Sequence, residues 1–85
     1  MNSRRLFARV LRGEVGNVAF ADLAQLLVDL GFHERSGRGS HRIFTDAGVF
    51  EIVNLQVENG DAKRYQVRQV AGLIRRYNFE LKEDQ

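Results

Sequence analysis

A histidine follows a short glycine-rich segment in the middle of the chain. His41 comes directly after Gly39 and Ser40. Arg38 precedes this group and Arg42 follows it. A neutral imidazole can accept a proton near neutral pH, and guanidinium groups attract phosphates, so the arrangement suits a general base that acts on a polyanion. His41 is therefore our candidate catalytic residue, and its polar neighbours are candidate substrate contacts.

The start of the last predicted helix is a second candidate site. Lys63 and Arg64 stand at its N-terminal end, where free backbone N–H groups can bind an anion and where cations are disfavoured by about 0.3–1 kcal/mol each. Either the fold tolerates this cost, which Asp61 partly offsets, or the cations bind a phosphate. Tyr65 and Arg68 add an aromatic ring and a further cation on the following turns.

Other chemistries fit the sequence less well. The chain has no cysteine, and its second histidine is His33, so no zinc-ligand spacing is present. Ser40 and His41 are neighbours on a predicted strand, where neighbouring side chains point to opposite faces, which argues against a serine–histidine pair. We expect no metal and no cofactor. An exposed histidine without any catalytic role stays open as the plainer alternative.

Hydrophobic periodicity predicts the elements that position these residues. Leucines recur at helical spacing between residues 23 and 30, with Asp22 in the first turn and Gly31 at the C-terminal end. The other predicted helices span residues 3–12, with Ser3 as the N-cap, and about 64–77. The predicted strands span residues 32–36, 40–45 and 50–55. Short glycine-containing turns between them favour antiparallel pairing.

Together these elements predict an α+β domain with the order α-α-β-β-β-α. Its three-stranded antiparallel sheet has helices packed on one face and leaves the other face wet. We expect Phe44 to point into the core from the second strand. Because residues three apart on a strand point to opposite sides, His41 should then face solvent.

Charge is distributed unevenly along the chain. The net charge is only +2, yet acidic residues are absent from residues 1–13, 35–45 and 62–79, which hold all of the arginines. This segregation predicts a basic face, although an ordinary solvated charged surface is the alternative. The longest uncharged apolar run, residues 18–21, is far too short to span a membrane. We therefore expect a cytoplasmic protein.

Four pieces of the sequence, in their order and spacing, point to a known family. They are residues 26–32, 39–44, 54–56 and 62–69. These pieces resemble the HicA family of small bacterial toxins. The resemblance covers residues 20–77 of a single domain (residues 1–85), to which residues 1–13 add an N-terminal helix. Arg42 stands where a second histidine is common in the family, and Arg64 stands where proline often opens the last helix.

The resemblance implies a double-stranded-RNA-binding-domain-like fold and a ribosome-independent mRNA interferase. It also implies a type II toxin–antitoxin system, in which a HicB-like antitoxin protein neutralises the toxin. The family's catalytic histidine corresponds to His41, which would take the proton from a ribose 2′-OH without a metal. The candidate RNA-binding residues are then Arg38, Ser40, Arg42, Lys63, Arg64, Tyr65 and Arg68.

Two other functions stay open. A non-catalytic RNA-binding module of the same fold would use basic residues at a helix start and a loop to read the shape and phosphates of A-form RNA. A protein-binding adaptor would present the same basic face to an acidic partner. RNA cleavage in the presence of EDTA distinguishes the nuclease from both.

Overall fold

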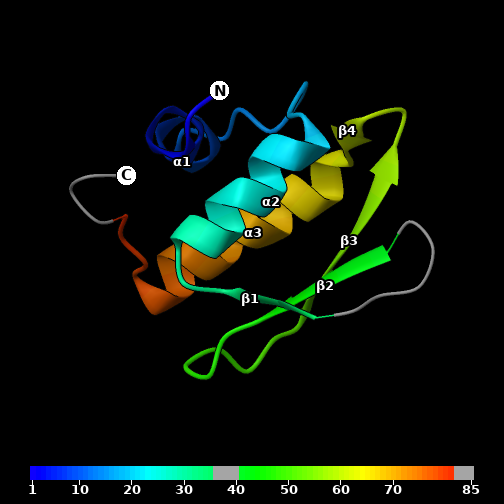
Figure 1. The fold of residues 1–85 in the computed structure, drawn as a ribbon. Helices are drawn as coiled ribbons and strands as arrows, with labels where there is room; N and C mark the ends of the chain where they lie inside the picture. The colour runs from blue at the N-terminus through cyan, green and yellow to red at the C-terminus, as the bar shows by residue number, and fades with distance from the viewer. Residues whose placement is uncertain (36–40, 82–85) are drawn as a thin grey trace.

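Three helices and one antiparallel sheet form the protein (Figure 1). This computed structural model describes residues 1–35 and 41–81. The helices are α1 (Ser3–Leu11), α2 (Phe20–Asp29) and α3 (Arg64–Tyr77). The strands are β1 (His33–Arg35), β2 (His41–Thr45), β3 (Val53–Glu58) and β4 (Asp61–Ala62). The predicted α+β class is confirmed, and the described residues add a short fourth strand to the predicted order.

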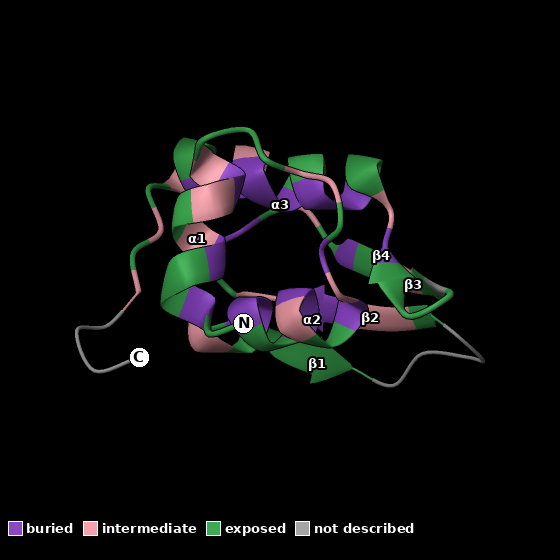
Figure 2. Cartoon of the chain, turned by 90° about the horizontal axis from the view of Figure 1, so that it is seen from above, coloured by how far each residue is buried: buried purple, intermediate pink, exposed green. Residues whose placement is uncertain are grey.

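The sheet is antiparallel throughout, with its strands side by side in chain order. Both α2 and α3 lie over one face of this sheet (Figure 1). The N-terminal helix α1 packs against α2 and α3 and buries Leu6 and Val10 there (Figure 2). This helix therefore contributes to the core of the domain itself. None of the helices in the described residues is long and apolar enough to cross a membrane.

The hydrophobic core lies between the sheet and the helices. Phe44 on β2 and Val53 and Leu55 on β3 point into it and are fully buried. His41 and Asn54, which alternate with these residues along the two strands, are exposed. The prediction that Phe44 is buried while His41 faces solvent is confirmed.

Helix boundaries follow local sequence signals closely. α3 has the predicted bounds, and α2 is followed by Gly31, whose φ of 106° is the left-handed conformation that glycine adopts without strain. The prediction of Ser3 as the N-cap of α1 is wrong. Asn2 is the cap, since its side chain accepts a hydrogen bond from the Arg5 backbone N–H at 2.8 Å. Ser3 is instead buried, and its hydroxyl donates to Asp29 of α2.

The third strand departs from the prediction at both ends. The sequence predicts residues 50–55, but β3 begins at Val53 because the preceding segment is bonded to α3. There the Tyr77 hydroxyl donates to the Glu51 carboxylate at 2.6 Å. At the other end, Asn59 and Gly60 have φ angles of 55° and 82°, which fit a two-residue type I′ hairpin turn. This turn returns the chain as β4, the strand that the periodicity analysis misses.

Candidate functional site

His41 lies on the face of the sheet that the helices leave uncovered. In the register of β2 and β3, Gln56 is directly opposite His41, and Asn54 is opposite Ile43. Side chains of directly paired residues point to the same side of a sheet, so these residues share one surface with His41. We call this surface, defined by His41, Ile43, Asn54 and Gln56, the open face.

A hydrogen bond joins His41 to its neighbour across the strands. The Nδ1 atom of His41 lies 3.2 Å from the side-chain oxygen Oδ1 of Asn54. An amide oxygen can only accept a hydrogen bond, so the bond requires the imidazole proton on Nδ1. The other ring nitrogen, Nε2, then carries a free lone pair. This is the tautomer that a general base needs, and the ring is exposed to solvent.

Asn54 is in turn held by the start of α3. The Gln66 side-chain nitrogen Nε2 donates to the backbone oxygen of Asn54 at 3.4 Å. The Gln66 oxygen Oε1 accepts from the backbone N–H of Lys63 at 3.3 Å. Gln66 is only 1% exposed, so this amide is a buried link between the N-terminus of α3 and the strand that carries Asn54. Asn54 belongs to one of the family-like pieces of the sequence, but no local pattern indicates its contact with Gln66.

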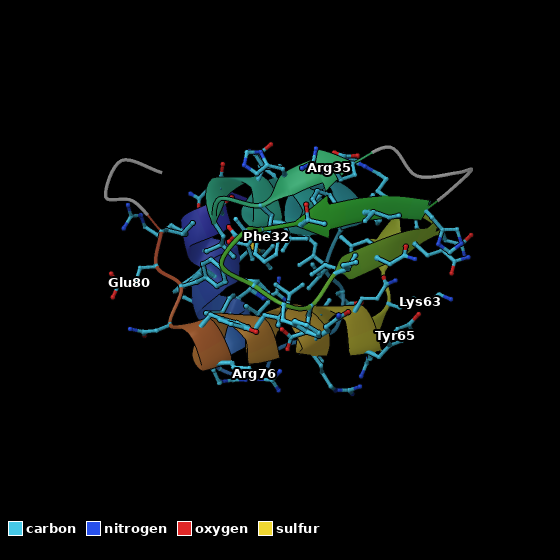
Figure 3. The ribbon with its side chains drawn as sticks, turned by 90° about the horizontal axis from the view of Figure 1, so that it is seen from below. Phe32, Arg35, Lys63, Tyr65, Arg76 and Glu80 are labelled. Carbon is cyan, nitrogen blue, oxygen red and sulfur yellow. The ribbon has the colours of Figure 1, made fainter. Side chains whose placement is uncertain are left out.

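Arg35 on β1 is a cation on the open face that the sequence analysis does not include among the site residues. It pairs with Ile43 in the β1–β2 register, and its Nε atom donates to Thr45 Oγ1 at 3.4 Å. Figure 3 shows Arg35 on β1, beside β2. Strand alternation could have indicated its side of the sheet, but only once the pairing of the two strands was known.

Arg42 points to the opposite side of the sheet from His41. Its guanidinium group forms two hydrogen bonds of 2.6 Å each with the Glu34 carboxylate. It also lies over the rings of Phe20 and Phe44, at 5.3 and 5.8 Å from their centroids. The hydrogen bond from Arg42 lowers the pKa of Glu34, and the same bond raises the pKa of Arg42. Contact between Arg42 and a phosphate near His41 would therefore require this ion pair to break.

Lys63 and Tyr65 lie together at the N-terminal end of α3 (Figure 3). Tyr65 is 58% exposed, so its ring is available to a ligand. A cleft of about 380 Å³ adjoins this helix start. The carboxylate of Asp61 lies in the same cleft as the cations Lys63 and Arg64, so the cleft carries charges of both signs. The cleft is lined by Asn17, Asn59, Asp61, Ala62, Lys63 and Arg64.

Two arginines of α3, Arg64 and Arg68, face α1 and the loop that follows it. The guanidinium group of Arg64 packs against Gly16, where an added Cβ would come within 3.2 Å of its Nη2 atom. Arg68 lines a separate cleft of about 280 Å³ that includes Val10 of α1 and Val15 of the loop. The fold thus does not bring these two arginines onto the open face with His41.

Two predicted contacts, Arg38 and Ser40, lie outside the described residues, so their roles stay predictions. In the part of the chain that the structure describes, no three histidine, cysteine or carboxylate residues are grouped so that they could hold a metal ion. Comparison of the chain with protein-family models, curated proteins and solved structures found no match. The residues of the open face and the motifs described above are therefore the features that indicate a function.

Proposed function

We propose that this protein is a HicA-type toxin, an endoribonuclease that cleaves mRNA without a metal ion and independently of the ribosome. The observation that carries the proposal is the exposed His41 ring, whose Nδ1 atom is bonded to Asn54 Oδ1 so that Nε2 is left as the base. Asn54 belongs to one of the sequence pieces that resemble the family. The order α2-β1-β2-β3-α3, with both helices on one face, is also the arrangement expected of a double-stranded-RNA-binding-domain-like fold.

The proposed reaction uses the RNA's own 2′-hydroxyl as the nucleophile. His41 Nε2 takes the proton from this hydroxyl, and the oxygen forms a bond to the adjacent phosphorus. The bond from phosphorus to the 5′ oxygen breaks, and that oxygen leaves with a proton from water. The products are a 2′,3′-cyclic phosphate and a free 5′-hydroxyl, with no metal required at any step.

Cations near His41 would stabilise the charge that grows on the phosphorus centre. Arg35 is suited to this role because it shares the open face with His41. Lys63 is tied to the same region through the Gln66–Asn54 link. Arg38 and Ser40, which precede His41 in the chain, remain proposed RNA contacts. Arg64, Tyr65 and Arg68 would contact parts of the RNA that extend past α3.

The proposed partner is a HicB-like antitoxin protein that neutralises the toxin in the cytoplasm. A partner that covered the open face would block His41 from RNA. Co-expression tests this proposal directly: the chain alone should arrest growth, and the neighbouring reading frame should restore it. Growth arrest that persists in a His41→Ala variant would count against nuclease activity as the cause.

A non-catalytic RNA-binding module is the second candidate function. The observation that favours it is the cleft at the start of α3, whose lining includes Lys63 and Arg64 but not His41. Such a module would bind RNA through a helix start and basic side chains, and affinity would fall steeply with salt. It would leave the RNA intact.

The deciding experiment incubates end-labelled single-stranded RNA with the purified protein in EDTA. The nuclease shortens the RNA, and a substrate with 2′-deoxyribose at the cleaved position stays intact because it lacks the nucleophile. We expect His41→Ala to slow cleavage by about 10²–10⁴-fold, the usual contribution of a general base. His33→Ala is the matched control, since His33 is an exposed histidine on the neighbouring strand β1. Cleavage by the two variants at equal rates would rule out His41 as the base.

A further inference from the structure

Phe50 is more exposed than any other large apolar side chain in the described residues. Its exposed fraction is 94%, and Ile52, two residues later, is 61% exposed. Phenylalanine is among the side chains that proteins most often bury, and contiguous exposed apolar surface marks binding sites. The Phe50–Ile52 pair is therefore a candidate contact for a ligand.

The loop around Phe50 is anchored on both sides, which holds the ring outward. Val49 is 8% exposed, and its backbone N–H donates to the Asp46 oxygen at 3.0 Å. On the other side, Glu51 accepts a hydrogen bond from Tyr77 and pairs with Arg76 of α3. The Phe50 N–H itself lies 3.4 Å from the Tyr77 hydroxyl oxygen, to which it donates. These bonds hold the loop in the conformation in which the Phe50 ring is exposed.

Phe50 precedes Ile52 by two residues, and Glu51 between them is bonded to α3 on the helix side of the sheet. Ile52 precedes the buried Val53 and so points to the open face, in line with Asn54 and Gln56. Ile52 is four residues from Gln56, the partner of His41, which is about 13 Å at ~3.3 Å per residue. A single RNA strand running along the open face would reach from His41 to Phe50 within a few nucleotides.

We propose that Phe50 is a stacking platform for an unpaired base of the RNA, with Ile52 packing beside it. The proposal rests on the proposed function and specifies its substrate: an RNA strand that is single-stranded at this position. Aromatic rings on exposed sheet surfaces bind RNA by stacking on bases that are splayed out of a helix. Of the described side chains on this face, Arg35 carries a positive charge, while Asn54 and Gln56 offer hydrogen bonds, which suits a nucleotide strand.

The test measures RNA affinity in a His41→Ala background, where the strand is bound but not consumed. Fluorescence anisotropy with a labelled single-stranded RNA gives the Kd of Phe50→Ala, Phe50→Leu and Phe50→Tyr. Base–aromatic stacking is worth about 1–3 kcal/mol per base, so Phe50→Ala should weaken binding roughly 5- to 150-fold. Phe50→Leu should bind RNA as weakly as Phe50→Ala, because leucine has no ring. Phe50→Tyr should bind RNA as tightly as the parent protein, because tyrosine keeps the ring. Val28→Ala, which trims an exposed apolar residue of α2, is the control and should not change the Kd.

A second arm locates the base by replacing one base at a time with an abasic site. One position should lose affinity with Phe50 present and lose none in Phe50→Ala, because the two changes remove the same contact. Two results would contradict stacking on Phe50: RNA binding by Phe50→Leu that is as tight as in the parent protein, or no abasic position whose effect depends on Phe50. Neither result would contradict RNA binding by the open face. If none of these proteins binds RNA and the wild type does not cleave it, the proposed function fails as well.

Discussion

The side-chain oxygen of Asn54 lies 3.2 Å from Nδ1 of His41, across two neighbouring strands of the sheet. Asn54 is two residues before Gln56, the direct partner of His41, so the two side chains are diagonal neighbours on the open face. This contact turns an exposed histidine into one with a defined tautomer and orientation. Asn54 is thus a positioning residue, and it makes the nuclease proposal testable beyond the removal of His41.

Substitution of Asn54 should change the pH dependence of cleavage. In Asn54→Asp a carboxylate beside Nδ1 favours the protonated imidazolium, which cannot act as a base. We expect the acid limb of the kcat/KM profile to move to higher pH, while activity well above this limb is retained. Asn54→Ala removes one hydrogen bond and should slow cleavage roughly 2- to 13-fold without this displacement. An acid limb that stays in place in Asn54→Asp would show that Asn54 does not contact the base.

The buried amide of Gln66 should contribute to stability. Gln66→Leu keeps the size of the side chain but leaves the Asn54 oxygen and the Lys63 N–H without their partner. An unsatisfied buried polar group costs about 1–3 kcal/mol, so the free energy of unfolding in urea should fall by that amount. Gln69→Leu, at an exposed position of the same helix, is the control. An equal free energy of unfolding for the two variants would mean that the hydrogen bonds of Gln66 do not contribute to stability.

The Glu34–Arg42 ion pair predicts a dependence of stability on pH. The hydrogen bond from Arg42 lowers the pKa of Glu34 from its usual 4.5 in the folded protein. The pair therefore stabilises the fold above that usual value, and this contribution is lost as the pH falls through the lowered pKa. Glu34→Gln should be less stable than the wild type at neutral pH, by no more than about 1 kcal/mol because the pair is exposed. In thermal melts, the difference in stability between the wild type and Glu34→Gln should shrink as the pH falls through the acid range. Glu80→Gln, at an exposed position, should be as stable as the wild type.

The two arginines on opposite sides of the sheet should differ in their effect on RNA. Arg35 shares the open face with His41, while Arg42 is bonded to Glu34 on the helix-covered side. Arg35→Gln should weaken RNA binding and reduce the slope of log Kd against log salt by about 0.7–1, the value for one lost phosphate contact. Arg42→Gln should leave that slope unchanged and lower stability as Glu34→Gln does. The reverse order of effects would place the RNA on the other side of the sheet.

Local periodicity was sufficient for several features of the fold. The alternation of side chains along the second strand predicted that Phe44 points inward and His41 outward. The apolar repeat of the last helix predicted its bounds at residues 64–77. The sequence did not predict that β3 starts at Val53, because hydrogen bonding of Glu51 to Tyr77 joins residues far apart in the chain. The hairpin at Asn59 and Gly60 was signalled by its turn residues, but the strand after it is only two residues long and has no periodicity to detect.

The sequence by itself determined the inward or outward direction of each side chain on its own strand or helix, because that direction follows from a repeat of two or 3.6 residues. It also placed the histidine, the cations and the family-like motifs in order along the chain. Only the tertiary structure decided which of these residues meet. The β2–β3 register brings Asn54 to His41, and the β1–β2 register adds Arg35. Helix packing turns Arg68 toward α1 and Arg64 toward the loop that follows α1. Such contacts depend on strand pairing and packing between distant segments, which no local pattern encodes.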